Sequence, residues 1–352
     1  MKIVNIGIVA HVDAGKTSLT ERILFETKVI SKIGRVDHGN TQTDTLDLEK
    51  RRGITIKASV VSFFVQDQKI NLIDTPGHAD FIAEVERSLS VLDGAILVIS
   101  AVEGIQAQTK FLMAILKQLG IPTILFINKI DRMGARADAL IAQIKAKLTP
   151  AVIPLNRPAN LGARDAYVVA NDFSRAADAH FLEACIDLLT QNDDQLLEAY
   201  INNGQVTESQ LHRALARQSA DAKLYPICFG SAITGAGVAE LLTGVSTLFP
   251  AGSSAEDAPL SGVVFKIERE ASGEKIAYVR LFAGRILVRA EVAVRRQSLR
   301  SKEETQHYKV KKLHLFRAGK SVQESAAEAG DICKIWGLTD VKIGDVVGER
   351  SG

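Results

Sequence analysis

The chain has 352 residues, of which 46% are hydrophobic and 24% are charged. This composition excludes a disordered or fibrous protein, and the length favours two or three domains over one compact core. The net charge of +2 gives no overall basic excess, so any contact with RNA must come from a local patch. Since no segment approaches the ~18 apolar residues of a membrane span, we expect no membrane partner.

The first 130 residues alternate apolar strands with helical segments. The expected strands are residues 3–10, 70–74, 94–100 and 123–128, and the expected helices include residues 16–26 and 108–119. Such alternation is typical of a mostly parallel sheet covered by helices. The sequence therefore predicts an α/β fold for this part of the chain.

The pattern changes to a mostly helical one at about residues 134–225. Thr207 and Gln210 form a capping-box pattern at the start of one of the helices. The apolar run at 225–230 then resembles a strand that returns to the sheet, and residues 238–249 are expected to be its last helix. We therefore expect a first domain over residues 1–250 that contains a helical insert.

A linker rich in Gly, Ser, Ala and Pro follows at residues 250–260. Beyond it, apolar residues recur with period two, for example at 263–267 and 277–281. Several short strands separated by glycines predict a small β-barrel over residues 262–352. The basic run at 309–312 fits a solvated strand face, with an RNA contact as the alternative.

Three cysteines, Cys185, Cys228 and Cys333, lie far apart in apolar stretches. Their spacing fits no metal site, and their odd number argues against a disulfide framework. We expect buried free thiols in a reducing compartment, the cytoplasm.

Residues 10–17, AHVDAGKT, fit a phosphate-binding loop in which Ala10 replaces the usual first glycine. Backbone N–H groups at the start of a helix can point at phosphates, Lys16 supplies a cation, and the Thr17 hydroxyl can bind Mg²⁺. The predicted nucleotide-binding residues of this loop are Asp13, Ala14, Gly15, Lys16, Thr17 and Ser18.

Two further segments can complete the phosphate and magnesium site. In DTPGH, residues 74–78, the carboxylate of Asp74 suits Mg²⁺ through water, and the N–H of Gly77 can approach a γ-phosphate. Alone this segment would be a simple turn, but it follows a phosphate loop in the expected order. In RGITI, residues 52–56, Thr55 is predicted to be a second hydroxyl ligand of Mg²⁺.

The segment NKID, residues 128–131, indicates which base is bound. The carboxylate of Asp131 can accept the two donors on the guanine edge and would repel the ring acceptor of adenine, a discrimination of roughly 10⁴-fold. Asn128 and Lys129 belong to the same predicted site. After a later strand, Ser231 and Ala232 are predicted to support the base. The sequence thus favours GTP over ATP.

These motifs in this order resemble those of the translational GTPases, in particular elongation factor G and its relatives. The resemblance is close over residues 1–131 and 230–232 and looser through the barrel. It implies that His78 positions the attacking water when ribosomal RNA draws it inward, and that Val12 and Ile54 form a hydrophobic gate. It also implies that Asp13 helps to hold a monovalent cation.

The resemblance implies a ribosome-stimulated GTPase that converts GTP and water to GDP and phosphate with Mg²⁺. No arginine finger is evident in cis, so we expect a low intrinsic rate. The expected partners are GTP, GDP and the ribosome, both its RNA and its proteins. We expect a monomer without a DNA partner.

Within the family, residues 36–44 and 87–109 look most similar to tetracycline ribosomal-protection proteins. An elongation factor G-type translocation factor is the alternative, and a GTP-switched interaction module with negligible turnover is an alternative of another class. Members of both translational groups carry further C-terminal domains, whereas this sequence ends at Gly352. We therefore expect it to be the N-terminal part of a longer factor.

Overall fold

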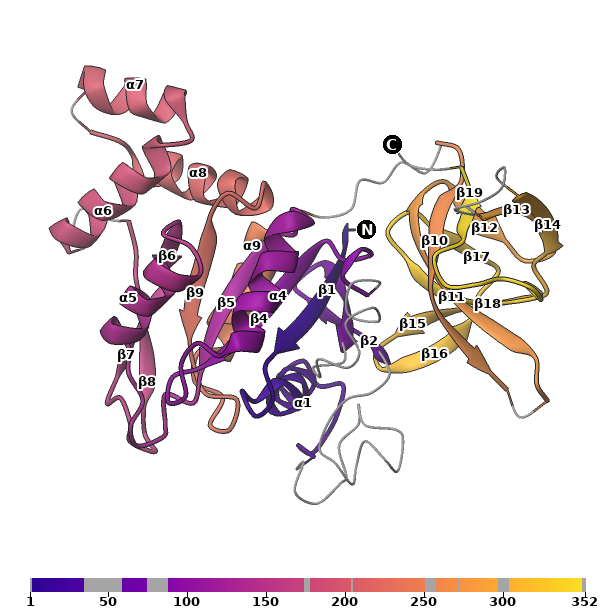
Figure 1. Ribbon diagram of the computed structural model, residues 1–352, viewed down its shortest axis with the longest axis horizontal. Helices are drawn as coiled ribbons and strands as arrows, with labels where there is room; N and C mark the ends of the chain where they lie inside the picture. Colours follow the sequence, from indigo (N-terminus) through magenta and orange to yellow (C-terminus); the bar gives the residue numbers. More distant parts are fainter. Residues whose placement is uncertain are drawn as a thin grey trace.

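The computed structural model describes residues 2–34, 59–74, 88–173, 178–203, 205–250, 258–270, 272–296 and 304–349. An α/β domain occupies the centre, its insert extends to one side, and a β-rich domain lies on the other (Figure 1). The predicted fold class is confirmed: a mostly parallel sheet with helices, followed by a β-barrel.

The sheet of the α/β domain has seven strands in the order β2-β3-β1-β4-β5-β9-β6. All neighbouring pairs are parallel except β2 with β3. The strands are β1 (Lys2–Ala10), β2 (Ser59–Val65), β3 (Gln68–Asp74), β4 (Gly94–Ser100), β5 (Thr123–Asn128), β6 (Val152–Pro154) and β9 (Tyr225–Phe229). The central strands β4 and β5 are buried along their whole length, which explains their unbroken apolar sequences.

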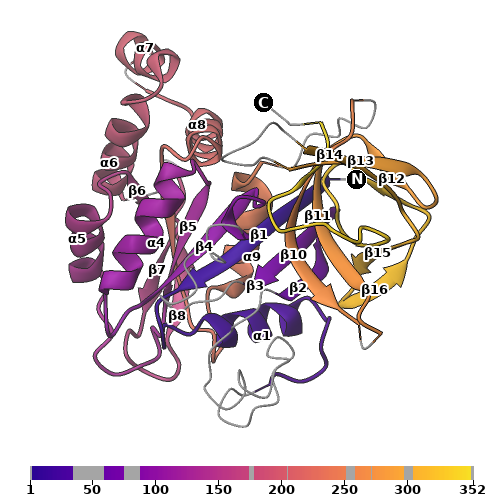
Figure 2. The same cartoon turned by 45° about the vertical axis from the view of Figure 1, so that its right-hand side comes forward.

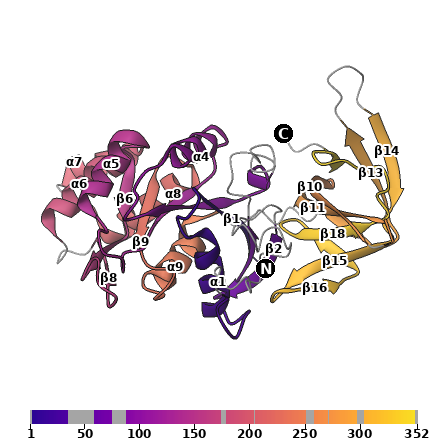
Figure 3. The ribbon, with the colours of Figure 1, turned by 60° about the horizontal axis from the view of Figure 1, so that its bottom comes forward.

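Helices cover both faces of this sheet (Figure 3). Helices α1 (Lys16–Glu26) and α9 (Val238–Leu248) pack on one face. Helices α4 (Ala107–Gln118) and α5 (Asp138–Lys147) pack on the other. Among the described residues, no helix is long and apolar enough to span a membrane.

The insert is less purely helical than its sequence suggests. It contains α6 (Ala179–Thr190), α7 (Asp194–Asn203) and α8 (Glu208–Ala220), and the capping box of Thr207 and Gln210 is present at α8. It also contains a hairpin of β7 (Asn156–Ala159) and β8 (Tyr167–Ala170), while β6 extends the main sheet. Strands of three or four residues are too short to produce a recognisable period, so the sequence did not reveal them.

The barrel is built mainly from one sheet with the order β14-β13-β19-β10-β11-β18-β15-β16, and β12 pairs with β17 beside it (Figure 2). Its strands are β10 (Ser261–Arg269), β11 (Lys275–Ala283), β12 (Arg285–Leu287), β13 (Glu291–Arg296), β14 (Glu304–Lys309), β15 (Lys312–Arg317), β16 (Lys320–Gln323), β17 (Ala326–Glu328), β18 (Ile332–Trp336) and β19 (Val346–Gly348).

Strand β11 is buried on both sides, although its sequence alternates. Ala277, Val279 and Leu281 face the barrel core, as their spacing predicts. Tyr278 and Arg280 lie on the opposite side and are also buried, because that side packs against the α/β domain. The alternation therefore separates two buried surfaces, one of which is an interdomain contact.

Polar side chains join the two domains in the same interface. The guanidinium of Arg280 lies 2.9 Å from the carboxylate of Asp93, which precedes β4. A second buried pair joins Lys69 of β3 to Asp331 at 2.9 Å. Asn5 of β1 donates to Asp93 at 2.7 Å and to the carbonyl of Gly330 at 3.1 Å. The barrel is thus anchored to the strands that carry the loops described below.

The three cysteines are free and buried, as predicted. Burial raises the pKa of Cys185 and Cys228 to about 12 and raises the pKa of Cys333 as well. These thiols therefore stay protonated at neutral pH and serve as small apolar side chains.

Candidate functional site

Five segments follow the carboxyl ends of parallel strands in one sheet, and four of them carry the predicted motifs; the segment after β4 carries none. They follow β1, β3, β4, β5 and β9, which the pairing places side by side in the order β3-β1-β4-β5-β9. In open parallel sheets this edge is where ligands bind. The topology thus brings segments from residue 11 to residue 236 to one edge.

The first loop, between β1 and α1, presents a helix N-terminus. Gly15 is the residue before the helix and has a φ of 99°, a conformation that favours glycine. The Leu19 N–H donates to the Gly15 carbonyl at 2.9 Å, which closes the first helical turn. Lys16 and Thr17 stand at the start of α1 and are only 9% and 8% exposed. The amides of this turn form the kind of site that holds phosphate oxygens.

Asn128, the last residue of β5, connects this loop to the loop after β9. Its Nδ2 donates to the carbonyl of Ala14 at 2.8 Å, and its Oδ1 accepts from the N–H of Ala232 at 2.9 Å. The side chain is 3% exposed. A Cβ on Gly15 would lie 2.2 Å from Asn128 Nδ2, so only glycine allows this approach. Asn128 therefore fixes the spacing between two predicted binding loops.

Asp131 follows Asn128 by three residues, and one of its carboxylate oxygens accepts no hydrogen bond from the described residues. This oxygen, Oδ1, is buried. The nearby loop is folded by Ser231, whose Oγ accepts from the N–H groups of Ile233 and Thr234 at 3.2 and 3.1 Å. A buried carboxylate oxygen without a donor suits a ligand that brings its own N–H groups.

Lys129, between Asn128 and Asp131, is held by a residue that the sequence reasoning missed. Lys129 adopts a φ of 69°, and its Nζ lies 3.0 Å from Oε1 of Glu103. Burial acts to raise the pKa of Glu103, but the hydrogen bond and charge of Lys129 outweigh it and lower that pKa. Glu103 follows β4, so its position at the same sheet edge was the signal that could have identified it.

The first turn of α4 also contacts the phosphate loop. Gln108 Oε1 accepts from the N–H of Val12 at 3.4 Å. Val12, predicted to be one half of a hydrophobic gate, is 43% exposed. His11 is half-buried, and burial lowers its pKa. His11 is thus neutral at pH 7.

The phosphate and magnesium side of the site is described only in part. Asp74 is the last residue of β3, and its Cα pairs with that of Ile8 in β1. This register places the end of β3 beside the start of the phosphate loop. Gly77, His78, Ile54 and Thr55 lie outside the described residues, so their predicted roles stay predictions.

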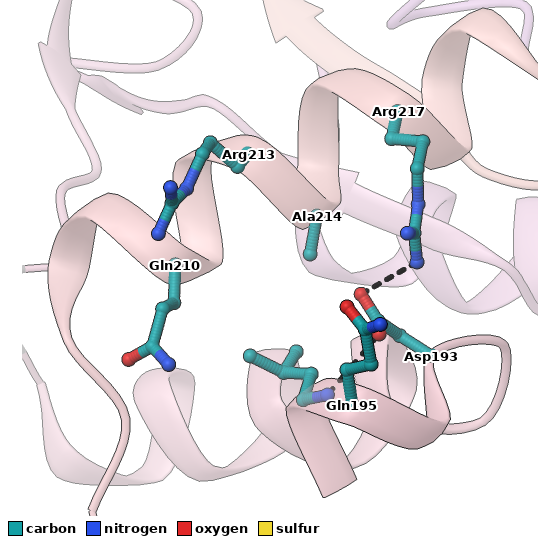
Figure 4. Close-up of a pocket in the computed structure, with 7 residues that line it drawn as sticks. Asp193, Gln195, Gln210, Arg213, Ala214 and Arg217 are labelled. Atoms are coloured by element: carbon teal, nitrogen blue, oxygen red, sulfur yellow. Dashed lines mark hydrogen bonds and ion pairs between the residues drawn. The ribbon is translucent and has the colours of Figure 1, made fainter. Parts of the chain in front are cut away.

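A separate hollow of about 380 Å³ lies in the insert, between α7 and α8. Figure 4 shows Gln210 and Arg213 on one side of it and Asp193 on the other. Arg217 is paired with Asp193 at 2.7 Å, so its charge is compensated. Gln195 lies in the first turn of α7, but the Asp193 carboxylate already accepts from the Leu196 N–H at 3.1 Å, so this helix N-terminus is capped. The same carboxylate is paired with Arg217, so the described residues that line the hollow offer no carboxylate oxygen like that of Asp131.

The sheet-edge site has the groups needed for a purine nucleotide. One end offers amides, Lys16 and the Thr17 hydroxyl for phosphates and a hard cation. The other end offers the Asp131 carboxylate for two N–H donors. Glycine at position 15 lets the phosphate-loop backbone lie directly against the Asn128 side chain, which joins the two ends of the site.

Comparison with protein families identifies two domains in this order. Residues 1–251 match the elongation factor Tu GTP-binding domain, and residues 274–348 match elongation factor Tu domain 2. The solved structure of a protein from Thermus thermophilus superimposes with a TM-score of 0.84 over 100% of this chain and 55% of that chain. Its sequence is 23% identical, so it supports the fold alone.

Individual relatives are more similar in sequence. An oxytetracycline resistance protein of Streptomyces rimosus is 46% identical over 100% of this chain and 53% of its own length. A tetracycline resistance protein of Clostridium perfringens is 45% identical over 99% of this chain and 52% of its own length. The chain therefore spans about half the length of these curated relatives.

Proposed function

Because this chain belongs to the translational GTPase family defined by the elongation factor Tu GTP-binding domain, we propose that it binds GTP with Mg²⁺ and hydrolyses it to GDP and phosphate. The observation that carries this proposal is the buried Oδ1 of Asp131, which no described residue satisfies, next to the Asn128 bridge. Guanine supplies two N–H donors that a carboxylate can accept, whereas adenine presents an acceptor to it.

The phosphate end of the site receives the charged part of the nucleotide. Lys16 and the amides of residues 13–17 hold the phosphate oxygens, and Ser18 belongs to the same helical turn. Lys129, fixed by Glu103, lies beside the base-binding carboxylate. Ser231 shapes the loop whose next residue, Ala232, supports the base.

Thr17, Asp74 and Thr55 are the proposed holders of Mg²⁺. The position of Thr17 at the start of α1 and of Asp74 at the end of the adjacent strand fits a hard cation with oxygen ligands. When bound, the ion would neutralise charge on the phosphate oxygens. Asp13, with its φ of 63° at the outer turn of the loop, is proposed to assist a monovalent cation.

His78 is the proposed catalytic residue, and it would orient the attacking water behind the gate of Val12 and Ile54. We propose that this step is slow in the isolated protein and fast on the ribosome. For the whole protein we propose a cytoplasmic, monomeric ribosomal-protection factor, a proposal supported by the names of its relatives. An elongation factor G-type factor and a GTP-switched module with little turnover remain the rivals.

The test compares phosphate release by the wild type and His78→Ala, with and without ribosomes, at saturating GTP. We expect ribosomes to stimulate the wild type strongly. His78→Ala should bind GTP with unchanged affinity and lose the stimulation. Equal stimulated turnover in the variant would contradict the catalytic role of His78, and no turnover in either protein would favour the switched module.

A further inference from the structure

Arg22, in the middle of α1, holds the backbone of the loop after β9. Its Nε donates to the carbonyl of Ala232 at 3.0 Å, and its Nη2 donates to the carbonyl of Ile233. Its Nη1 lies 3.5 Å from Oε1 of Glu26, one turn further along the helix. All three guanidinium nitrogens are thus engaged, and the side chain is only 13% exposed.

This contact fixes a residue that is already held from its other side. The N–H of Ala232 donates to Asn128 Oδ1, while its carbonyl accepts from Arg22. The loop has little freedom left, because its own turn is closed by the Gly235 N–H, which donates to the Ser231 carbonyl at 2.9 Å. Arg22 therefore holds the loop from the side of α1.

The same helix begins at the phosphate loop. Lys16 and Thr17 occupy its first turn, and Arg22 lies between one and two turns later. A helix is stiff over this length, so Arg22 links the phosphate end of the site to the base end. Asn128 makes a second link between the same two loops, from Ala14 to Ala232.

We propose that Arg22 is a positioning residue that holds the loop of residues 231–236 in its base-receiving conformation and so prolongs the lifetime of bound guanine nucleotide. This inference rests on the function proposed above. Arginine suits the role because its planar group donates to two carbonyls at once, whereas lysine offers a single point charge. The turn also depends on glycine at position 235, whose φ of 92° is a conformation that other residues rarely adopt.

The test measures release of fluorescently labelled GDP from the wild type, Arg22→Gln and Arg22→Lys. Hydrogen bonds to charged groups are worth about 1.5–3 kcal/mol, which corresponds to roughly 10- to 100-fold. We expect Arg22→Gln to release GDP about 10- to 100-fold faster and Arg22→Lys to lie between it and the wild type. Arg213→Gln is the matched control, since Arg213 is an exposed arginine of the insert, and it should release GDP at the wild-type rate.

A second measurement separates positioning from a general loss of structure. Inosine diphosphate lacks the 2-amino group that Asp131 would bind but keeps the rest of the base. Arg22→Gln should weaken the binding of GDP and of inosine diphosphate by the same factor, because the substitution disturbs the loop of residues 231–236 and not the Asp131 carboxylate. The melting temperature of the nucleotide-free variant should stay close to that of Arg213→Gln.

The outcomes of these measurements decide whether Arg22 has the proposed positioning role. Wild-type release rates in Arg22→Gln, with GDP bound normally by the wild type, would overturn the role of Arg22 and leave the proposed function intact. A melting temperature lowered in Arg22→Lys and Arg22→Gln alike, with equal GDP release in both, would reduce Arg22 to a structural role. Failure of the wild type to bind GDP would overturn both proposals together.

Discussion

A buried charge pair, Arg280 with Asp93, joins the α/β domain to the barrel. The substitution Arg280→Met measures how much this pair contributes to the free energy of unfolding. Two oxygens of Asp93 lie 2.9 and 3.1 Å from Arg280 Nη2, and the side chains are 15% and 2% exposed, respectively. Removing one partner of such a pair costs about 3–5 kcal/mol, because the other charge is left uncompensated. Asp93 would keep its two bonds from Asn5, so we expect the lower end, about 3 kcal/mol.

The assay is urea unfolding followed by the fluorescence of Trp336, the only tryptophan of the chain, which is 6% exposed in the same interface. Arg285→Met, at an exposed position in β12, is the control and should change the free energy of unfolding by less than about 0.5 kcal/mol. The double variant Asp93→Asn with Arg280→Met should recover part of the loss, because no lone charge remains. A loss below about 1 kcal/mol for Arg280→Met would refute this reasoning.

Three further outcomes follow from the site and the core. Gly15→Ala should lower GDP affinity at least about tenfold, measured by titration, because its Cβ would collide with Asn128 and its φ is positive. Asp131→Asn should exchange guanosine for xanthosine nucleotides in a competition assay, and undiminished GTP affinity would contradict it. Cys228 should resist a thiol reagent at pH 8 until urea unfolds the protein, because its pKa of about 12 keeps it protonated and burial excludes the reagent.

The parts of the fold that the sequence predicted correctly are mostly those marked by local motifs. The strand at residues 94–100 and the helix at 16–26 have the bounds that the sequence indicates, because burial on both faces and a phosphate-loop helix start are local signals. The hairpin of β7 and β8 could not be predicted, because its strands are too short to show a period. The same is true of β6, whose place in the sheet depends on pairing with the distant β9.

Contacts between residues far apart in the chain could not be predicted from sequence patterns. Arg280 has the spacing of a solvent-facing residue in β11, yet it is 2% exposed, since the barrel packs against the other domain there. Arg22 reaches residues more than two hundred positions later in the chain. Glu103 pairs with Lys129 only because β4 and β5 are adjacent. Such partners depend on topology, which is fixed by the whole fold.

The most direct test of a guanine-specific site is displacement of labelled GDP from the wild-type protein by unlabelled nucleotides in the presence of Mg²⁺. We predict that GTP and GDP displace the label at concentrations close to their own dissociation constants. ATP and ADP should fail to displace it even at a roughly thousandfold excess. Displacement by ATP at the concentrations that suffice for GTP would contradict the assignment of Asp131 and with it the account of this site.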